Sequence, residues 1–199
     1  MIFPILAGFL GFIVILTIFL KRGDKDKKLK EEEFWNRENE ANNTRRQDIS
    51  RLNYIEIPQD RLPFGCTGET DILDIESEID KLCEKKILNF EGATNTELKQ
   101  KYGAPNIDEL IECDEAFINL ARLLNEWGTA LYDIERLDEA QAVLEFAVEI
   151  KSDVPTSYLT LAKIYKRKRM KNELAALREN AAALKTSAKD TILQKLDML

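Results

Sequence analysis

The first thirty residues constrain this chain more than any other stretch of its sequence. Residues 1–20 contain no charged side chain, whereas residues 21–30 contain six Lys or Arg residues against two Asp. Twenty residues of helix, at about 1.5 Å rise each, span the roughly 30 Å hydrocarbon core of a bilayer. The sequence therefore predicts a transmembrane anchor over residues 1–20, with everything that follows on one side of the membrane.

The position of the positive charges favours one orientation of this anchor. Lys and Arg close to a span tend to stay on the cytoplasmic side, and here they all follow the apolar run. A secretory signal would have a basic start and a small-residue cleavage site, and the sequence has neither. We expect a single-pass protein of the cell membrane with its N-terminus outside and its C-terminal domain in the cytoplasm. The alternative is an exported, membrane-tethered domain that serves envelope assembly.

Charge and composition narrow the classes of function. The formal net charge is −7, and because residues 21–30 contribute +4 and residues 1–20 none, residues 31–199 carry −11. Such an acidic domain is a poor partner for nucleic acid, which needs a basic surface. The chain contains no histidine, no phosphate-binding glycine loop and three cysteines that are far apart. We therefore expect no enzyme activity, catalytic residue, cofactor or metal site. A carboxylate-based enzyme is the remaining alternative.

Composition divides the chain into four segments. After the anchor over 1–20, residues 21–53 are polar and charged and predict a juxtamembrane stalk that is helical in places. Residues 54–70 hold two prolines and two glycines and predict a loop fastened to the domain by its apolar side chains. Residues 71–199 predict a helical domain. Within the stalk we expect Phe34 and Trp35 to pack on this domain, with the lipid headgroup region as the alternative.

The apolar periodicity after residue 71 is that of α-helices. Isoleucines and leucines recur at steps of three to four residues from Ile72 to Leu82. A capping-box pattern begins at Thr94, and Gly103 is placed to end the short helix that follows. A longer helix is predicted to start after Asn106. The fold class is therefore all-α.

The C-terminal third repeats itself with a period of 34 residues. Large residues at Leu124, Trp127 and Leu131 and the small Gly128 match Tyr158, Leu161, Tyr165 and Ala162, each 34 positions later. Trp127-Gly128, Leu137-Asp-Glu-Ala140 and Pro155 fit a helix-turn-helix pattern, and the stretch from about 121 to 186 resembles the tetratricopeptide repeat. The second copy departs from that family at Leu174 and Arg178. The resemblance implies antiparallel helix-turn-helix units with Trp127 and Tyr165 in the core.

Two such repeats need helices that cover their ends. We expect residues 71–118 to cover one end and residues 187–199 the other. The resemblance also implies that the first helix of each repeat lines a groove that binds a peptide or protein, and an acidic or carboxylate-ended partner would suit the basic second copy. The implied groove residues are Arg122, Asn125, Thr129, Tyr132, Lys163, Lys166 and Arg167, with Thr156 and Leu159 beside them. A solvated helix end is the alternative explanation of the basic run.

Together these features favour an interaction protein. The expectation is a membrane-anchored adaptor or scaffold that resembles tetratricopeptide-repeat proteins and holds a protein partner at the cytoplasmic face of the membrane. Contact with the membrane is expected through residues 1–20.

Overall fold

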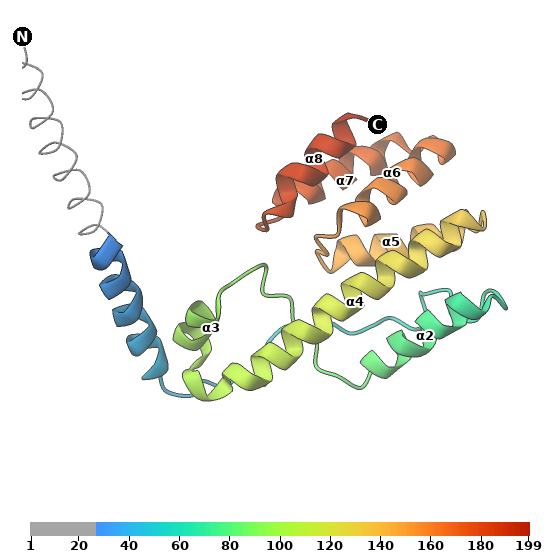
Figure 1. Ribbon diagram of the computed structural model, residues 1–199. Coiled ribbons are helices and arrows are strands. Elements are labelled where there is room, and N and C mark those ends of the chain that lie inside the picture. The colour runs from blue at the N-terminus through green and yellow to red at the C-terminus, as the bar shows by residue number, and fades with distance from the viewer. Residues whose placement is uncertain (1–26) are drawn as a thin grey trace, which may run out of the picture. The chain divides into compact units, whose positions relative to one another are not determined.

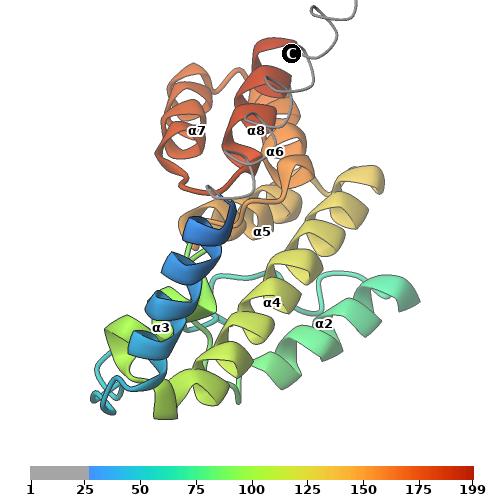
Figure 2. The same ribbon diagram turned by 60° about the vertical axis from the view of Figure 1, so that its left-hand side comes forward.

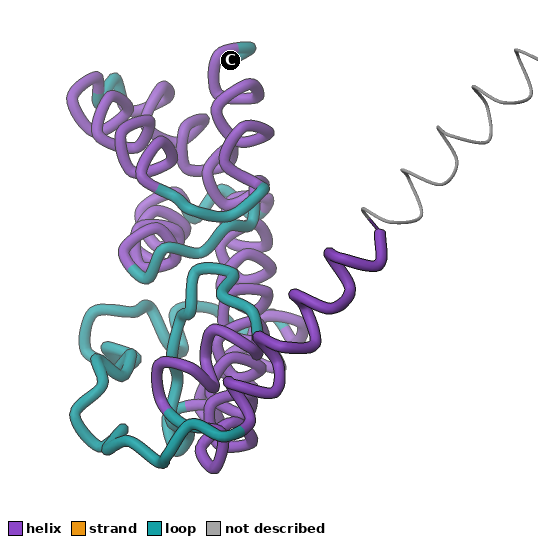
Figure 3. Tube along the Cα trace, turned by 90° about the vertical axis from the view of Figure 1, so that its left-hand side faces the viewer, coloured by secondary structure: helices purple, strands orange, loops and turns teal. Residues whose placement is uncertain are grey.

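A computed structural model describes residues 27–199 of the chain, and these residues form helices and loops without any strand (Figure 3). Residues 27–42 are helical, and the later elements follow along the chain (Figure 1). They are α2 (Thr70–Leu82), α3 (Asn95–Tyr102), η1 (Ala104–Asn106), α4 (Ile107–Asp133), α5 (Leu137–Glu149), α6 (Pro155–Lys168), α7 (Lys171–Ala183) and α8 (Ala188–Asp197). The predicted all-α class is confirmed for this part of the chain.

The predicted anchor over residues 1–20 and the start of the predicted stalk lie outside the described residues. From residue 27 onward, no helix combines the length and the apolar character that a bilayer crossing requires.

Contacts within the chain divide it into two compact units. The first unit holds the described part of the N-terminal segment, up to Gln47, together with Asn95–Pro105. The second holds Asp48–Thr94 and Asn106–Leu199. The sequence placed α3 in the helical domain that starts at residue 71, whereas its contacts in the structure group it with the segment before Gln47.

In the first unit, the helix over residues 27–42 is tied to α3 by polar contacts. The Thr96 hydroxyl donates a hydrogen bond of 2.6 Å to the Glu38 carboxylate, which also forms an ion pair with Lys99. The Lys99 ammonium donates a second hydrogen bond of 2.8 Å to the side chain of Asn42. Ala41 and Leu98 are the buried apolar residues of this unit.

Gly103 ends α3, as the sequence predicted. Its φ of +92° lies in the left-handed region that side chains disfavour. A Cβ atom at this position would also lie 2.3 Å from the carbonyl oxygen of Arg45. Glycine is therefore required both by the backbone turn and by the close approach of the segment after residue 42.

In the second unit, α2 packs along α4 and the loop before it covers the same core (Figure 2). The apolar stripe of α2 is buried at Ile72, Ile79 and Leu82, as its periodicity predicted. Within the predicted loop over 54–70, Leu62 is buried, and the Phe64 ring lies 4.9 Å from that of Trp127 between centroids. The expected fastening of this loop to the domain is confirmed.

Helices α4 to α7 form two helix hairpins that share one geometry. Both α5 and α7 contain 13 residues, and α7 begins 34 positions after α5. The turns before them match as well, because Glu135 has a φ of 61° and Arg169, 34 positions later, has a φ of 59°. Even the hydrogen bonds repeat: the amide of Arg136 bonds to the carbonyl of Leu131, and that of Met170 to the carbonyl of Tyr165. The 34-residue period is thus a period of backbone geometry.

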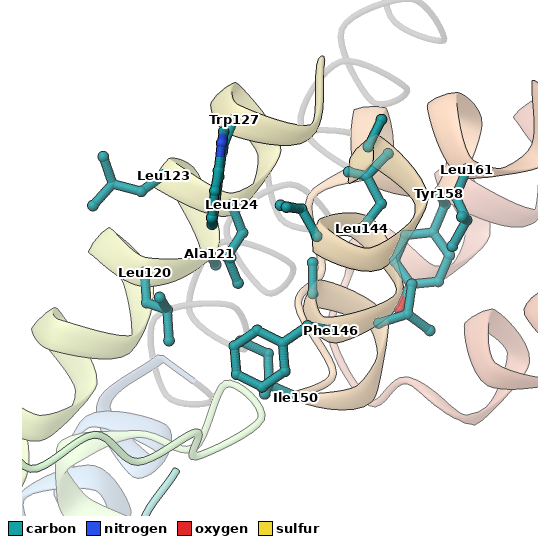
Figure 4. Packing of buried hydrophobic residues seen from close by; sticks show 14 of the residues in the cluster. Leu120, Ala121, Leu123, Leu124, Trp127, Leu144, Phe146, Ile150, Tyr158 and Leu161 are labelled. Atoms are coloured by element: carbon teal, nitrogen blue, oxygen red, sulfur yellow. The ribbon is translucent and has the colours of Figure 1, made fainter. Parts of the chain in front are cut away.

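The first hairpin closes tightly at Gly128. A Cβ atom on Gly128 would lie 2.5 Å from the Leu144 side chain, which is completely buried on α5. The same core brings together Trp127 from α4, Leu144 from α5 and Tyr158 from α6 (Figure 4). Trp127 is 0% exposed and Tyr165 is 6% exposed, which confirms their predicted place in the core.

The second hairpin is closed differently, because Arg178 stands 34 positions after Leu144. Its guanidinium points to solvent and forms an ion pair with Asp197 of α8. Leu177 and Ala181 supply the buried face of α7, while Leu174 packs against the core from a half-buried position. At the position that matches the buried Leu144, the second hairpin thus carries an exposed ion pair with the following helix.

Helix α8 is the C-terminal cover that the sequence predicted. It packs on both α6 and α7 and buries Ile192 completely. Leu193 and Leu196 are partly buried against the core, but Leu199 is exposed, contrary to its expected place in the cover.

Candidate functional site

The predicted groove residues lie along the solvent-facing sides of α4 and α6, which pack next to each other. One side of α6 carries exposed or half-exposed residues at steps of three to four positions: Thr156, Leu159, Lys163 and Lys166. On α4, the exposed Ile118 and Arg122 are followed by the half-exposed Asn125, Thr129 and Tyr132. We call these two neighbouring rows the α4–α6 face.

A hydrogen bond joins the two helices at this face. The Ser157 hydroxyl donates to the side-chain oxygen of Asn125 across 3.2 Å. Asn125 is therefore held by α6, and its position is fixed by the packing of the two hairpins. The nearby Thr129 hydroxyl is covered by protein and has no hydrogen-bond partner among the described residues.

Two arginines of the predicted groove are engaged in ion pairs. Arg122 pairs with Glu126 one turn along α4 at 2.7 Å and with Glu78 of α2 at 3.4 Å. Arg167 pairs with Glu135 at 2.7 Å and lies against Tyr132. The hydrogen bond from Arg167 lowers the pKa of the Glu135 carboxyl, so that carboxyl stays ionised next to the guanidinium.

The basic residues near the end of α6 differ in whether they form ion pairs. Lys168 forms an ion pair with Asp138 and donates a hydrogen bond of 2.6 Å to Gln141. Lys163 and Lys166 are exposed and form no ion pair within residues 27–199. They are therefore the two predicted groove cations that remain available to a ligand.

The sequence did not reveal a cleft that the structure contains on α4. This cleft has a volume of about 780 Å³ and lies where residues 82–86 approach the N-terminal half of α4. Its charged lining combines Lys85 and Lys86 with Glu109, Glu112 and Glu115. Lys86 forms a salt bridge of 2.8 Å with Glu109 and lies over the Tyr54 ring. The three carboxylates recur on one side of α4 at helical spacing, and this was the only sign of the cleft in the sequence. Their proximity to the two lysines depends on tertiary packing and could not be predicted.

The three cysteine thiols are each shielded in part from water. Burial raises the pKa of the Cys66, Cys83 and Cys113 thiols, so the reactive thiolate is disfavoured at each. Burial likewise raises the pKa of Tyr158 to about 12. Within residues 27–199, His, Cys, Asp and Glu side chains nowhere gather in a group of three or more that would hold a metal ion.

Comparisons of the whole chain with protein-family models, curated proteins and solved structures found no match.

Proposed function

We propose that this protein is a membrane-anchored adaptor whose α4–α6 face binds an acidic segment of a partner protein. The partner would be held at the cytoplasmic side of the membrane by the anchor over residues 1–20. In this proposal the chain resembles tetratricopeptide-repeat proteins, with α4–α5 and α6–α7 as its two repeats and α8 as the cover.

One observation carries the binding part of the proposal. Lys163 and Lys166 are left exposed and unpaired among the described residues, while the neighbouring Arg167 and Lys168 are both held by carboxylates. Two free ammonium groups one turn apart on the same side of a helix suit a ligand with successive carboxylates. The half-exposed Leu159 and Tyr132 supply apolar contact area on the same face.

The membrane part of the proposal is supported by the sequence. The apolar run over residues 1–20 and the basic residues that follow it favour an anchor with a cytoplasmic domain.

Charge reversal at the two lysines tests the binding surface. The double variant Lys163→Glu, Lys166→Glu should lose its partner in pull-downs from solubilised membranes, because two attractive charges become repulsive. Its melting temperature should stay close to that of the parent, since neither lysine has an ion-pair partner to lose among the described residues. The matched control is Lys81→Glu, Lys195→Glu, which changes the net charge equally at exposed sites on α2 and α8.

Equal recovery of partners by the parent and the Lys163/Lys166 variant would contradict the proposed surface. Orientation is tested separately, by fusing to the C-terminus a reporter that is active only outside the cell. Activity of that reporter would contradict the cytoplasmic orientation and favour the exported alternative.

A further inference from the structure

In the first compact unit, one face of the helix over residues 27–42 is only partly covered. Glu38 and Asn42 on this face bind α3, and Ala41 beside them is buried. Phe34 and Trp35 lie one turn earlier on the same face, three to four residues before Glu38. They are 47% and 55% exposed. The face that binds α3 therefore continues into an uncovered aromatic pair.

The two rings form a single apolar surface. Their centroids are 5.4 Å apart at an interplanar angle of 75°, the edge-to-face arrangement that aromatic pairs prefer. The two side chains thus contact each other on the helix, and together they present a small apolar patch.

The charges around this pair are distributed unevenly over the helix. Lys27 and Lys28 precede Phe34 and Trp35 by seven residues each, so they lie on the same face two turns away. Glu31 lies on that face as well, between the lysines and the rings. Glu32, three residues before Trp35, borders this face, whereas Glu33 and Glu40 lie on the opposite side. The helix therefore has one side with the aromatic rings and charges of both signs, and another side that bears Glu33 and Glu40.

We propose that Phe34 and Trp35 bind the headgroup region of an anionic bilayer, so that the part of this helix before the residues that bind α3 lies along the membrane surface. The inference rests on the proposed anchor, because Trp35 is only 15 residues beyond the apolar run that ends at Leu20. As a helix this length of chain measures about 22 Å, so the rings meet the headgroups where the helix runs along the bilayer surface. Aromatic rings favour the interface between water and hydrocarbon, and lysines favour anionic headgroups. The opposite side, which bears Glu33 and Glu40, would then face water.

The small size of the aromatic pair argues against a second copy of the chain as its occupant. Two half-exposed rings offer at most about 300 Å². A stable interface between proteins usually buries about 1,200–2,000 Å² in total. A bilayer needs no such area, since the anchor already holds the chain at its surface and the rings add to that contact.

The tryptophan content of the chain makes a direct test available. The chain has two tryptophans, and Trp127 is completely buried in the core of the second unit. The full chain is reconstituted into vesicles of phosphatidylcholine and phosphatidylglycerol whose acyl chains carry bromine close to the headgroups. We expect loss of Trp35 emission relative to vesicles without bromine. The variant Trp35→Phe should show no such loss, because bromine does not reach Trp127.

A matched control moves the indole around the helix. The double variant Trp35→Phe, Asn36→Trp shifts it by one residue, about 100° towards the side of Glu33 and Glu40, and should escape quenching. Equal quenching of this variant and the parent would overturn the assignment of the membrane-facing side. Flotation of the same vesicles separates the two proposals, since a chain that does not float lacks the anchor. A chain that floats while its Trp35 emission is unaffected by bromine would overturn the present inference, whether the ring is open to a soluble quencher or covered by protein.

Discussion

At the scale of single residues, Gly128 shows how a missing side chain shapes the fold. The hairpin of α4 and α5 closes so tightly that the Leu144 side chain occupies the space of a Cβ on residue 128. Leu144 is fully buried, so its side chain cannot move aside into solvent. The 34-residue period led to the same expectation of a small residue where the two helices cross, and here the sequence pattern and the contact agree.

Substitution of Gly128 should therefore destabilise the protein. Gly128→Ala introduces an overlap in a packed core, which typically costs about 1–3 kcal/mol, and Gly128→Leu should cost more. Thermal or denaturant unfolding followed by circular dichroism measures the effect. Leu144→Ala alone should cost about 2–5 kcal/mol because it leaves a cavity.

The double variant Gly128→Ala, Leu144→Ala reveals whether these two residues are coupled. If the methyl group introduced at position 128 fills part of the space that Leu144 vacates, the double variant should lose less stability than the two single variants together. Strictly additive losses would show that residue 128 is sensitive for a reason other than contact with Leu144.

At the scale of elements, one carboxylate holds two helices of the first unit together. Hydrogen bonds, first from Lys99 and then from Thr96, lower the pKa of the Glu38 carboxyl below its ordinary value of 4.5. A carboxyl whose pKa is lower in the folded state stabilises that state above its unfolded pKa, and the contribution disappears as the pH falls through the folded value. The contact between α3 and residues 27–42 should thus weaken in acid below pH 4.5 and remain constant near neutrality.

The variant Glu38→Gln isolates this effect. At neutral pH the parent should be the more stable protein, and the difference should shrink as the pH falls below 4.5. Thermal unfolding of both proteins over a pH series is the measurement. A stability difference that persists unchanged into strong acid would mean that the charge of Glu38 does not contribute to the contact.

The elements also show which features local patterns predict. Apolar periodicity located α2, α4 and α8, and Gly103 located the end of α3, because these features depend on residues that are neighbours in the chain. The grouping of α3 with residues 27–47 escaped prediction, since it depends on Glu38 and Lys99, which are 61 positions apart. Ion pairs of this kind follow from the tertiary arrangement. In an acidic chain, many other carboxylates would have been equally plausible partners for Lys99.

The candidate site illustrates the same limit. The repeat pattern indicated which sides of α4 and α6 face solvent, and the half-exposed to exposed positions from Arg122 to Lys166 agree with it. It did not indicate that Arg122 and Arg167 are neutralised by Glu78, Glu126 and Glu135. Periodicity determines the side of a helix, whereas availability for binding depends on what the neighbouring elements place beside it.

At the scale of the whole molecule, the loop before α2 belongs to the core of the second unit. Leu62 is buried and Phe64 packs on Trp127, while Ile55 and Ile57 contact the same cluster. A further tie joins distant parts of this unit, because Glu91 forms ion pairs with Lys151 and Lys185. The unit therefore starts well before the helical periodicity that first becomes visible at residue 71.

Removing this loop should destabilise the remaining helices. A fragment of residues 71–199 exposes the side of Trp127 that Phe64 covers, and loss of a large apolar side chain from a core costs about 3–5 kcal/mol. We expect it to be helical by circular dichroism but to melt well below a fragment of residues 48–199. Indistinguishable melting of the two fragments would show that the loop contributes little to the core.

The ion pairs between the two hairpins also fit one order of these hairpins. Glu135 and Asp138 of the first hairpin meet Arg167 and Lys168 at the end of α6. In an array of two copies of the first hairpin, the residues that match Arg167 and Lys168, 34 positions earlier, are Asp133 and Ile134, and these would face the carboxylates. In an array of two copies of the second hairpin, the residues that match Glu135 and Asp138 are Arg169 and Asn172, and these would face the two basic residues. Neither array has complementary charges along this edge, so these ion pairs fit the observed order of the two hairpins, and a longer array would need newly matched charges at each junction.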